Sequence, residues 1–202
     1  MIMRVRGLII ILAALLLAGC GNGEKARLSN PNTPYLAGGG NTQLPGTSGY
    51  DPISYWDGDG VSGRPSVAIY LNEQRAYFYK GDQLVGVSQV SAGREGHDTP
   101  PGTYKIIQKD PNHASSLYGD YVDSAGNAVK KDVELGKDPI PPGAHFLGAP
   151  MPYFMRITGG VGMHQGYLPG YPASHGCIRM PGKMAVIFYS NVDIGTPVTV
   201  VR

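Results

Sequence analysis

From Arg64 onward, short alternating runs of apolar and polar residues are separated by turn-forming residues, and this spacing constrains the fold most strongly. Val67, Ile69 and Leu71 form one such run, typical of a strand with one buried face. Similar runs between turn signals follow at 76–79, 84–91, 103–109, 153–158, 161–164 and 197–201. With 30 glycines and 17 prolines among 202 residues, a helical bundle is excluded because both residues break helices. The sequence predicts a mainly β fold.

Two segments depart from the strand pattern. A short helix is predicted over 181–191, where Pro181 suits the first helical position and the apolar residues after it share one face. Residues 110–150 are polar and rich in glycine and proline, with a hairpin signal at 124–127. This composition predicts a long loop, either a lid or binding loop over a site or a passive surface insertion.

Residues 1–19 have the pattern of a lipoprotein signal peptide. Arg4 and Arg6 precede an apolar run too short for a comfortable membrane span, and the run ends in Leu-Ala-Gly before Cys20. This ending resembles a bacterial lipobox, whose cysteine receives lipid; the alternative is a plain signal peptide with an incidental cysteine. Gly21 after Cys20 favours outer-membrane sorting, so the expected location is the periplasmic side of the outer membrane in the cell envelope.

Residues 20–63 are predicted to be the lipidated cysteine and a flexible linker, and residues 64–202 a single folded domain. The linker prediction rests on a stretch dominated by small and polar residues without an apolar period. Trp56 lies near its end, and the sequence leaves open whether it docks on the domain. From residue 21 onward 15 basic residues balance 15 acidic ones, so no net field attracts nucleic acid or an anionic membrane.

The second cysteine lies in the segment most informative about chemistry. Cys177 follows His175 by two residues and His164 by thirteen. A thiol near neutral pH needs an imidazole or similar partner to act as a nucleophile. The turn residues before Cys177 place it on a tight bend, where the amides of Gly176 and Cys177 can face a developing oxyanion. The residues alone thus favour cysteine acyl transfer.

Two other interpretations of this segment remain open from the residues alone. His164, His175 and Cys177 could ligate zinc, although their spacing matches no common zinc pattern and a fourth ligand is not evident. Alternatively, Cys177 is an inert buried side chain in a structural loop.

The segment resembles the L,D-transpeptidase catalytic-domain family, bacterial enzymes that cross-link or decorate peptidoglycan. The resemblance rests on Ser-His-Gly-Cys-Ile-Arg at 174–179, with Met-His-x-Gly upstream at 163–166. Weaker matches extend it over about residues 64–202, at 90–93, 99–104 and 195–198. It implies a β-rich, sandwich-like fold with the thiol in a cleft and a reaction without metal or cofactor; together with the lipobox pattern at Cys20, it predicts a lipid-anchored catalytic domain.

Roles for individual residues follow from the resemblance. It implies Cys177 as the nucleophile and His164 as its general base, with the backbone carbonyl of Gln165 orienting the ring. Support around the oxyanion is implied for Ser174, His175 and Gly176. The candidate substrate contacts are Arg179, Tyr153 and Gly166. Arg179 would hold a substrate carboxylate or, alternatively, form an ordinary structural pair.

The implied reaction is an acyl transfer in two halves. Cys177 attacks the L-centre carbonyl of the third stem-peptide residue, usually diaminopimelate, and releases the terminal D-Ala. The thioester then passes to diaminopimelate, a free D-amino acid, a protein lysine or water; water would make the chain an L,D-carboxypeptidase. The rival from another class is a non-catalytic peptidoglycan-binding lipoprotein. Expected partners are stem peptides and a membrane, through lipid on Cys20, but no nucleic acid.

Two departures from the family pattern affect the expected substrate contacts. Only nine residues separate His164 from Ser174, which predicts a reduced and more open covering loop. Arg179 stands where many members have asparagine.

Overall fold

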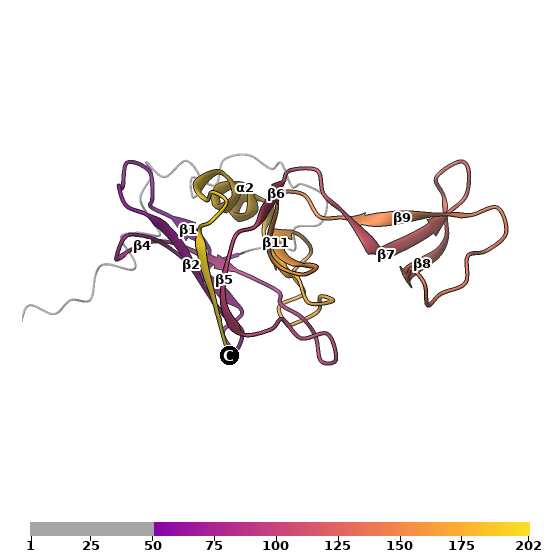
Figure 1. Ribbon diagram of the computed structural model, residues 1–202, viewed down its shortest axis with the longest axis horizontal. Helices are drawn as coiled ribbons and strands as arrows, with labels where there is room; N and C mark the ends of the chain where they lie inside the picture. The colour runs from indigo at the N-terminus through magenta and orange to yellow at the C-terminus, as the bar shows by residue number, and fades with distance from the viewer. Residues whose placement is uncertain (1–50) are drawn as a thin grey trace, which may run out of the picture.

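The computed structural model describes residues 51–202, which form a mainly β fold with one short helix, as predicted. Figure 1 shows a body of two sheets and the helix, from which a three-stranded sheet projects. The strands are β1 (Tyr55–Trp56), β2 (Pro65–Tyr70), β3 (Arg75–Lys80), β4 (Gln83–Gln89), β5 (Gly102–Lys105), β6 (Gln108–Asp110), β7 (Ala114–Val122), β8 (Ala128–Glu134), β9 (His145–Pro150), β10 (Phe154–Thr158), β11 (Val161–Gln165), β12 (Ile178–Met180) and β13 (Pro197–Val201). The helix is α2 (Gly182–Asn191). None of the helices in 51–202 is long and apolar enough to cross a membrane.

The larger sheet of the body has the strand order β1-β4-β3-β2-β13-β5. Strands β2, β3 and β4 are antiparallel neighbours joined by short turns. Gly81 has φ 59°, a left-handed conformation that glycine adopts at no steric cost. The last strand, β13, lies parallel to β2 and antiparallel to β5.

The predicted run 103–109 divides between the two sheets of the body. Its first half is β5 in the larger sheet and its second half is β6, which pairs with β10 in the smaller one. Ile106 marks the crossing: it is 1% exposed and its amide bonds to Thr196. An alternation pattern reports that one face is buried, but not which sheet a strand joins.

The core lies between the larger sheet, α2 and the buried face of the smaller sheet. Three aromatic rings cross it edge to face, with Trp56 and Phe188 at centroid distances of 5.1 and 5.0 Å from Phe78. Such contacts stabilise a core beyond the apolar area they bury. Trp56 thus joins β1 to the centre of the domain.

The prediction of a flexible linker through residue 63 is wrong for residues 51–63. Strand β1 pairs with β4, and the Trp56 side chain is 1% exposed. Its ring lies against Gly86, where a Cβ atom would come within 2.7 Å of it, and its Nε1–H donates to Asp59 Oδ1 at 2.9 Å. A single large aromatic residue buries enough area to hold a polar segment that has no apolar period. The remainder of the predicted linker and signal peptide, including Cys20, lies outside the described residues.

Trp56→Ala should therefore lower the free energy of unfolding by about 3–5 kcal/mol, the usual cost of truncating a buried large aromatic residue. A chain shortened to begin at Arg64 should lose a similar amount, because it lacks β1 altogether. Urea unfolding followed by circular dichroism measures both, with Trp56→Phe as the milder control. Unfolding midpoints equal to that of the longer chain would show that β1 contributes nothing to the domain.

The prediction that residues 110–150 form a loop is also wrong. They fold into the sheet β8-β7-β9, which projects from the body in Figure 1, and the hairpin signal at 124–127 is confirmed as the β7–β8 turn. Tyr121, Val122 and Val133 are buried, at 0%, 3% and 1% exposure. We call this element the inserted sheet. Its strands carry register shifts, so its few apolar residues do not recur with a strand period.

Candidate active site

The smaller sheet of the body, β12-β11-β10-β6, positions the residues that the sequence singles out. Strands β11 and β12 are parallel, with Met163 opposite Ile178 and His164 opposite Arg179. Met163 and Ile178 are fully buried and belong to the core. Because side chains alternate across a strand, His164 and Arg179 lie on the other face. Cys177, immediately before β12, belongs to that same face.

A sharp bend before β12 places Cys177. Gly176 has φ 108°, which only glycine adopts without strain. The Ser174 hydroxyl donates to the carbonyl of Cys177 and accepts the Gly176 N–H at 3.1 Å. Thr99 Oγ1 donates to the Gly176 carbonyl at 2.8 Å. The bend is thus held by the side chains of Ser174 and Thr99.

The hydrogen bond to Ser174 corrects one expectation. The Gly176 amide was predicted to face a developing oxyanion, but its N–H is directed at Ser174 Oγ. The amide of Cys177 is the remaining candidate donor for that role.

His164 has the surroundings of a neutral base. Its Nδ1–H donates to the Gln165 carbonyl at 2.7 Å, the orientation that the sequence predicted, so Nε2 carries the lone pair. The side chain is buried, and burial lowers its pKa to about 4, opposed by the bond to Gln165 and helped by the positive charge of Arg179. At neutral pH the imidazole is therefore uncharged and able to accept a proton.

Cys177 is half-buried and rests as a thiol. Its Sγ lies 3.5 Å from the Gly160 carbonyl, to which the S–H donates. Burial raises the pKa of the thiol, while the Gly162 amide and the charges of Arg156 and Arg179 oppose that effect. At neutral pH the side chain is therefore a thiol, and it lines the same cavity as the neutral imidazole of His164.

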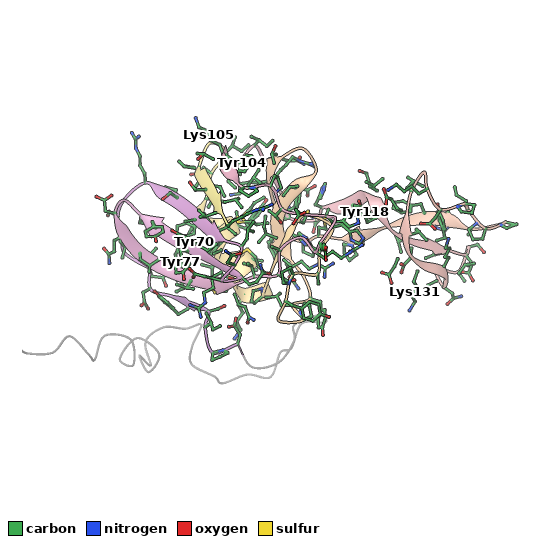
Figure 2. All side chains as sticks on the ribbon, turned by 90° about the horizontal axis from the view of Figure 1, so that it is seen from below. Tyr70, Tyr77, Tyr104, Lys105, Tyr118 and Lys131 are labelled. Atoms are coloured by element: carbon green, nitrogen blue, oxygen red, sulfur yellow. The ribbon has the colours of Figure 1, made fainter. Side chains whose placement is uncertain are left out.

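His175 connects the bend to the inserted sheet. Arg94 Nη2 lies 2.7 Å from His175 Nε2, and since arginine only donates, Nε2 accepts and the ring proton lies on Nδ1. The ring stacks on Tyr118 of β7 at 4.2 Å, and Figure 2 shows Tyr118 where the inserted sheet meets the body. Burial and the charge of Arg94 lower the pKa of His175, so it too is neutral at pH 7.

Arg179 lies between two cavities and lines both. Within residues 51–202 its guanidinium forms no hydrogen bond or close ion pair with another side chain, although the charge of Asp132 on β8 acts on it. Gly166 makes room for it: a Cβ atom at 166 would come within 2.9 Å of Arg179 Cγ. Partial burial lowers the pKa of the guanidinium, which nevertheless stays charged at neutral pH.

Tyr153 does not take part in this site. Its ring packs edge to face against Tyr189 of α2, with centroids 5.7 Å apart. It is a partner of the core and does not line the cavity around Cys177. The backbone at Tyr153, with φ 57°, turns the chain into β10 and directs the side chain towards α2. In this structure Tyr153 is therefore a packing residue, and its prediction as a substrate contact gains no support.

Cys177, His164 and Arg179 line one cavity of about 510 Å³, together with Gly166, Ser174 and His175. The inserted sheet and its connections supply the facing wall through His113, Tyr118 and Met151. Sequence reasoning missed His113 and Arg156, which also line this cavity. A signal for His113 was present, since it follows Asp110 by three residues, a spacing at which the two side chains can meet in a turn.

The second cavity, of about 470 Å³, adjoins the first across Tyr118 and His175 and contains acidic side chains of the inserted sheet. Within residues 51–202 no group of three or more His, Cys, Asp or Glu side chains is arranged to hold a metal ion.

Comparison with known proteins agrees with the fold and the motif. A family model, the YkuD L,D-transpeptidase catalytic domain, matches residues 64–200, and the chain belongs to that family. The probable L,D-transpeptidase YbiS of Escherichia coli strain K12 is 28% identical over 138 residues, covering 65% of this chain and 43% of YbiS. The chain thus matches less than half the length of this curated relative.

Two solved structures show the same fold. An L,D-transpeptidase from Mycobacterium smegmatis gives a TM-score of 0.51 at 20% identity, covering 69% of this chain and 59% of that chain. The L,D-transpeptidase LdtMt1 in complex with imipenem gives a TM-score of 0.50 at 19% identity, covering 68% and 58%.

Proposed function

We propose that this chain is a peptidoglycan L,D-transpeptidase in which Cys177 carries the acyl group. The observation that supports this most is the joint placement of a thiol, a neutral imidazole and a guanidinium around one cavity. Nucleophile, base and anion binder are the three groups that acyl transfer from a carboxylate-bearing peptide needs. A binding protein would need no nucleophile and base placed together.

In the acylation half, the thiol attacks the L-centre carbonyl of the third stem residue, and its proton passes to His164 Nε2. The tetrahedral oxyanion accepts a hydrogen bond from the amide of Cys177. His164 then gives the proton to the leaving D-Ala nitrogen, and the thioester remains. Arg179 binds a carboxylate of the stem peptide, because its planar fork matches a carboxylate and it lines the cavity beside Cys177.

In the second half, an amine attacks the thioester and restores the thiol. The acceptor is a second diaminopimelate, a D-amino acid or a protein lysine, and water in place of the amine gives hydrolysis. The inserted sheet forms one wall of the cavity and so limits which acceptor reaches the thioester. A β-lactam such as imipenem, with which LdtMt1 is in complex, should acylate Cys177 as a substitute for the stem peptide.

Incubation of the protein with purified muropeptides, followed by mass spectrometry, tests this function. The proposal predicts loss of D-Ala together with 3–3 cross-linked dimers, or exchange products when a D-amino acid is added. Only tripeptides and free D-Ala would make the chain a carboxypeptidase. Unchanged muropeptides with a folded protein would contradict the proposal.

We further propose that the chain is exported and attached by lipid on Cys20 to the periplasmic side of the outer membrane. The signal-like pattern of 1–19 supports this, and the balanced charge beyond residue 21 means that acyl chains alone would provide the attachment. Cys20→Ser should prevent lipid attachment and release the protein from membrane pellets. A variant that still matures normally and pellets after a salt wash would overturn the lipobox interpretation.

A further inference from the structure

His113 is another imidazole that lines the active-site cavity, and it has no role in the mechanism above. His113 lies between β6 and β7, where the chain leaves the body for the inserted sheet. Its carbonyl accepts the Met151 N–H at 2.8 Å, which ties together the two connections of that sheet. Its ring stacks on Phe154, with centroids 4.2 Å apart and planes 13° apart. Backbone and stacking together hold the ring in one place.

The ring of His113 is also oriented by a carboxylate. Asp110 Oδ2 lies 3.1 Å from His113 Nδ1, and since a carboxylate accepts, the ring proton lies on Nδ1. Nε2 then carries the lone pair, and the ring lines the cavity that also contains Cys177 and His164. A carboxylate, an imidazole and an open nitrogen form the arrangement that orients a general base and stabilises its protonated form.

The transfer half of the reaction requires such a base. An acceptor amine is an ammonium ion at neutral pH and must lose two protons to become an amide. His164 can take only one during attack, and as a buried base it competes poorly for the proton of an ammonium ion. We propose that His113, oriented by Asp110, removes the first proton from the acceptor ammonium; this inference rests on the proposed transpeptidase function.

In the transfer half of the reaction, the acceptor ammonium gives one proton to His113 Nε2 and becomes a neutral amine. The amine attacks the thioester carbonyl, its second proton passes to His164, the new C–N bond forms and the C–S bond breaks. The Cys177 thiolate then takes the proton from His164, and protonated His113 releases its proton to solvent.

The charged and titratable groups around His113 come from three strands. Asp110 from β6 faces Nδ1 of the ring at 3.1 Å. From β10, Arg156 lies 5.0 Å from the Phe154 ring, and it is already bonded to Gln108 Oε1 at 2.7 Å. From β11, His164 is neutral, so it adds no positive charge before the transfer step.

The test compares two acceptors that differ in their charge at pH 7. D-methionine is mostly an ammonium ion there, whereas methoxyamine is already neutral. In His113→Gln, transfer to D-methionine should fall about 10²-fold, the usual contribution of a general base. The ratio of methoxyamine transfer to stem-peptide acylation, measured in the same variant, should equal that of the unsubstituted chain. Raising the pH until the D-methionine amine is neutral should restore its transfer.

Two further variants complete the test. Asp110→Asn should reduce transfer to D-methionine with the same recovery at high pH, since it removes the carboxylate that orients the His113 ring while the ring itself stays. His145→Gln, on an exposed part of β9, is the matched control and should behave as the unsubstituted chain. Equal losses with both acceptors, or no loss with either, would overturn the role of His113. Failure of the unsubstituted chain to form an acyl-enzyme would instead overturn the proposed function, and this inference with it.

Discussion

Cys177→Ala should abolish acylation by stem peptides and by imipenem, reducing it by at least about 10⁴-fold. The reason is that Cys177 is the only cysteine among residues 51–202 and the only nucleophilic thiol lining the cavity with His164. Intact-protein mass spectrometry after incubation with imipenem should show one adduct on the unsubstituted chain and none on the variant. The half-buried thiol contributes little packing, so unfolding curves should be nearly the same.

Cys177→Ser tests the same position with a weaker nucleophile. It keeps a hydroxyl in place of the thiol, but an alcohol is a far weaker acid and the buried site offers only a neutral base. Slow acylation at the serine would support the position of residue 177 as the nucleophile. An adduct of unchanged size and rate in Cys177→Ala would assign the nucleophile to another residue.

His164→Ala should slow acylation by about 10²–10⁴-fold, the usual effect of removing a general base. Ser174→Ala should have a smaller effect, because its hydroxyl holds the bend through Gly176 and Cys177 but takes no proton from the thiol. Rates of imipenem acylation, followed by its absorbance, compare the two variants. Equal rates in His164→Ala and the unsubstituted chain would mean that another group activates Cys177.

The pH dependence of acylation gives a separate check on His164. Burial lowers its pKa to about 4 from an ordinary value of 6.5, so the neutral base persists as the pH falls through 6 and 5. The acylation rate should stay level down to about pH 5 and reach half its value near pH 4. The same shift predicts a loss of stability between pH 6.5 and 4, where the unfolded chain binds a proton that the folded chain does not. An acid limb near pH 6.5 would show that His164 is exposed and charged in solution.

The sequence predicted the centre of the site better than its walls. Cys177 and His164 belong to short motifs, one immediately before β12 and one on β11. Because these two strands pair, the two motifs are neighbours in the smaller sheet. The bond from His164 to Gln165 is equally local. Short motifs of this kind can be identified from the sequence because their local structure depends on few contacts with distant segments.

The walls of the cavity and the boundaries of the domain depend on contacts between segments far apart in the sequence. No local sequence pattern predicts such contacts. Trp56 is buried through its contacts with β3 and β4, more than twenty residues further along the chain, although its neighbours in sequence are polar. The inserted sheet is stabilised by a small cluster around Tyr121. The residues of this cluster come from three strands, and the pairing of these strands contains register shifts. The side chain of Tyr153 turns towards α2 because of a left-handed backbone conformation that its sequence does not signal.

The most direct test of the central claim is to trap the acyl-enzyme formed from a stem peptide. The protein is mixed with a synthetic tetrapeptide stem ending in D-Ala, without added amine, quenched in acid within seconds, and analysed by intact-protein and peptide mass spectrometry. The account predicts one adduct with the mass of the acyl tripeptide on the peptide that contains Cys177, matched by released D-Ala. An adduct on another residue, or D-Ala released equally by Cys177→Ala, would contradict it.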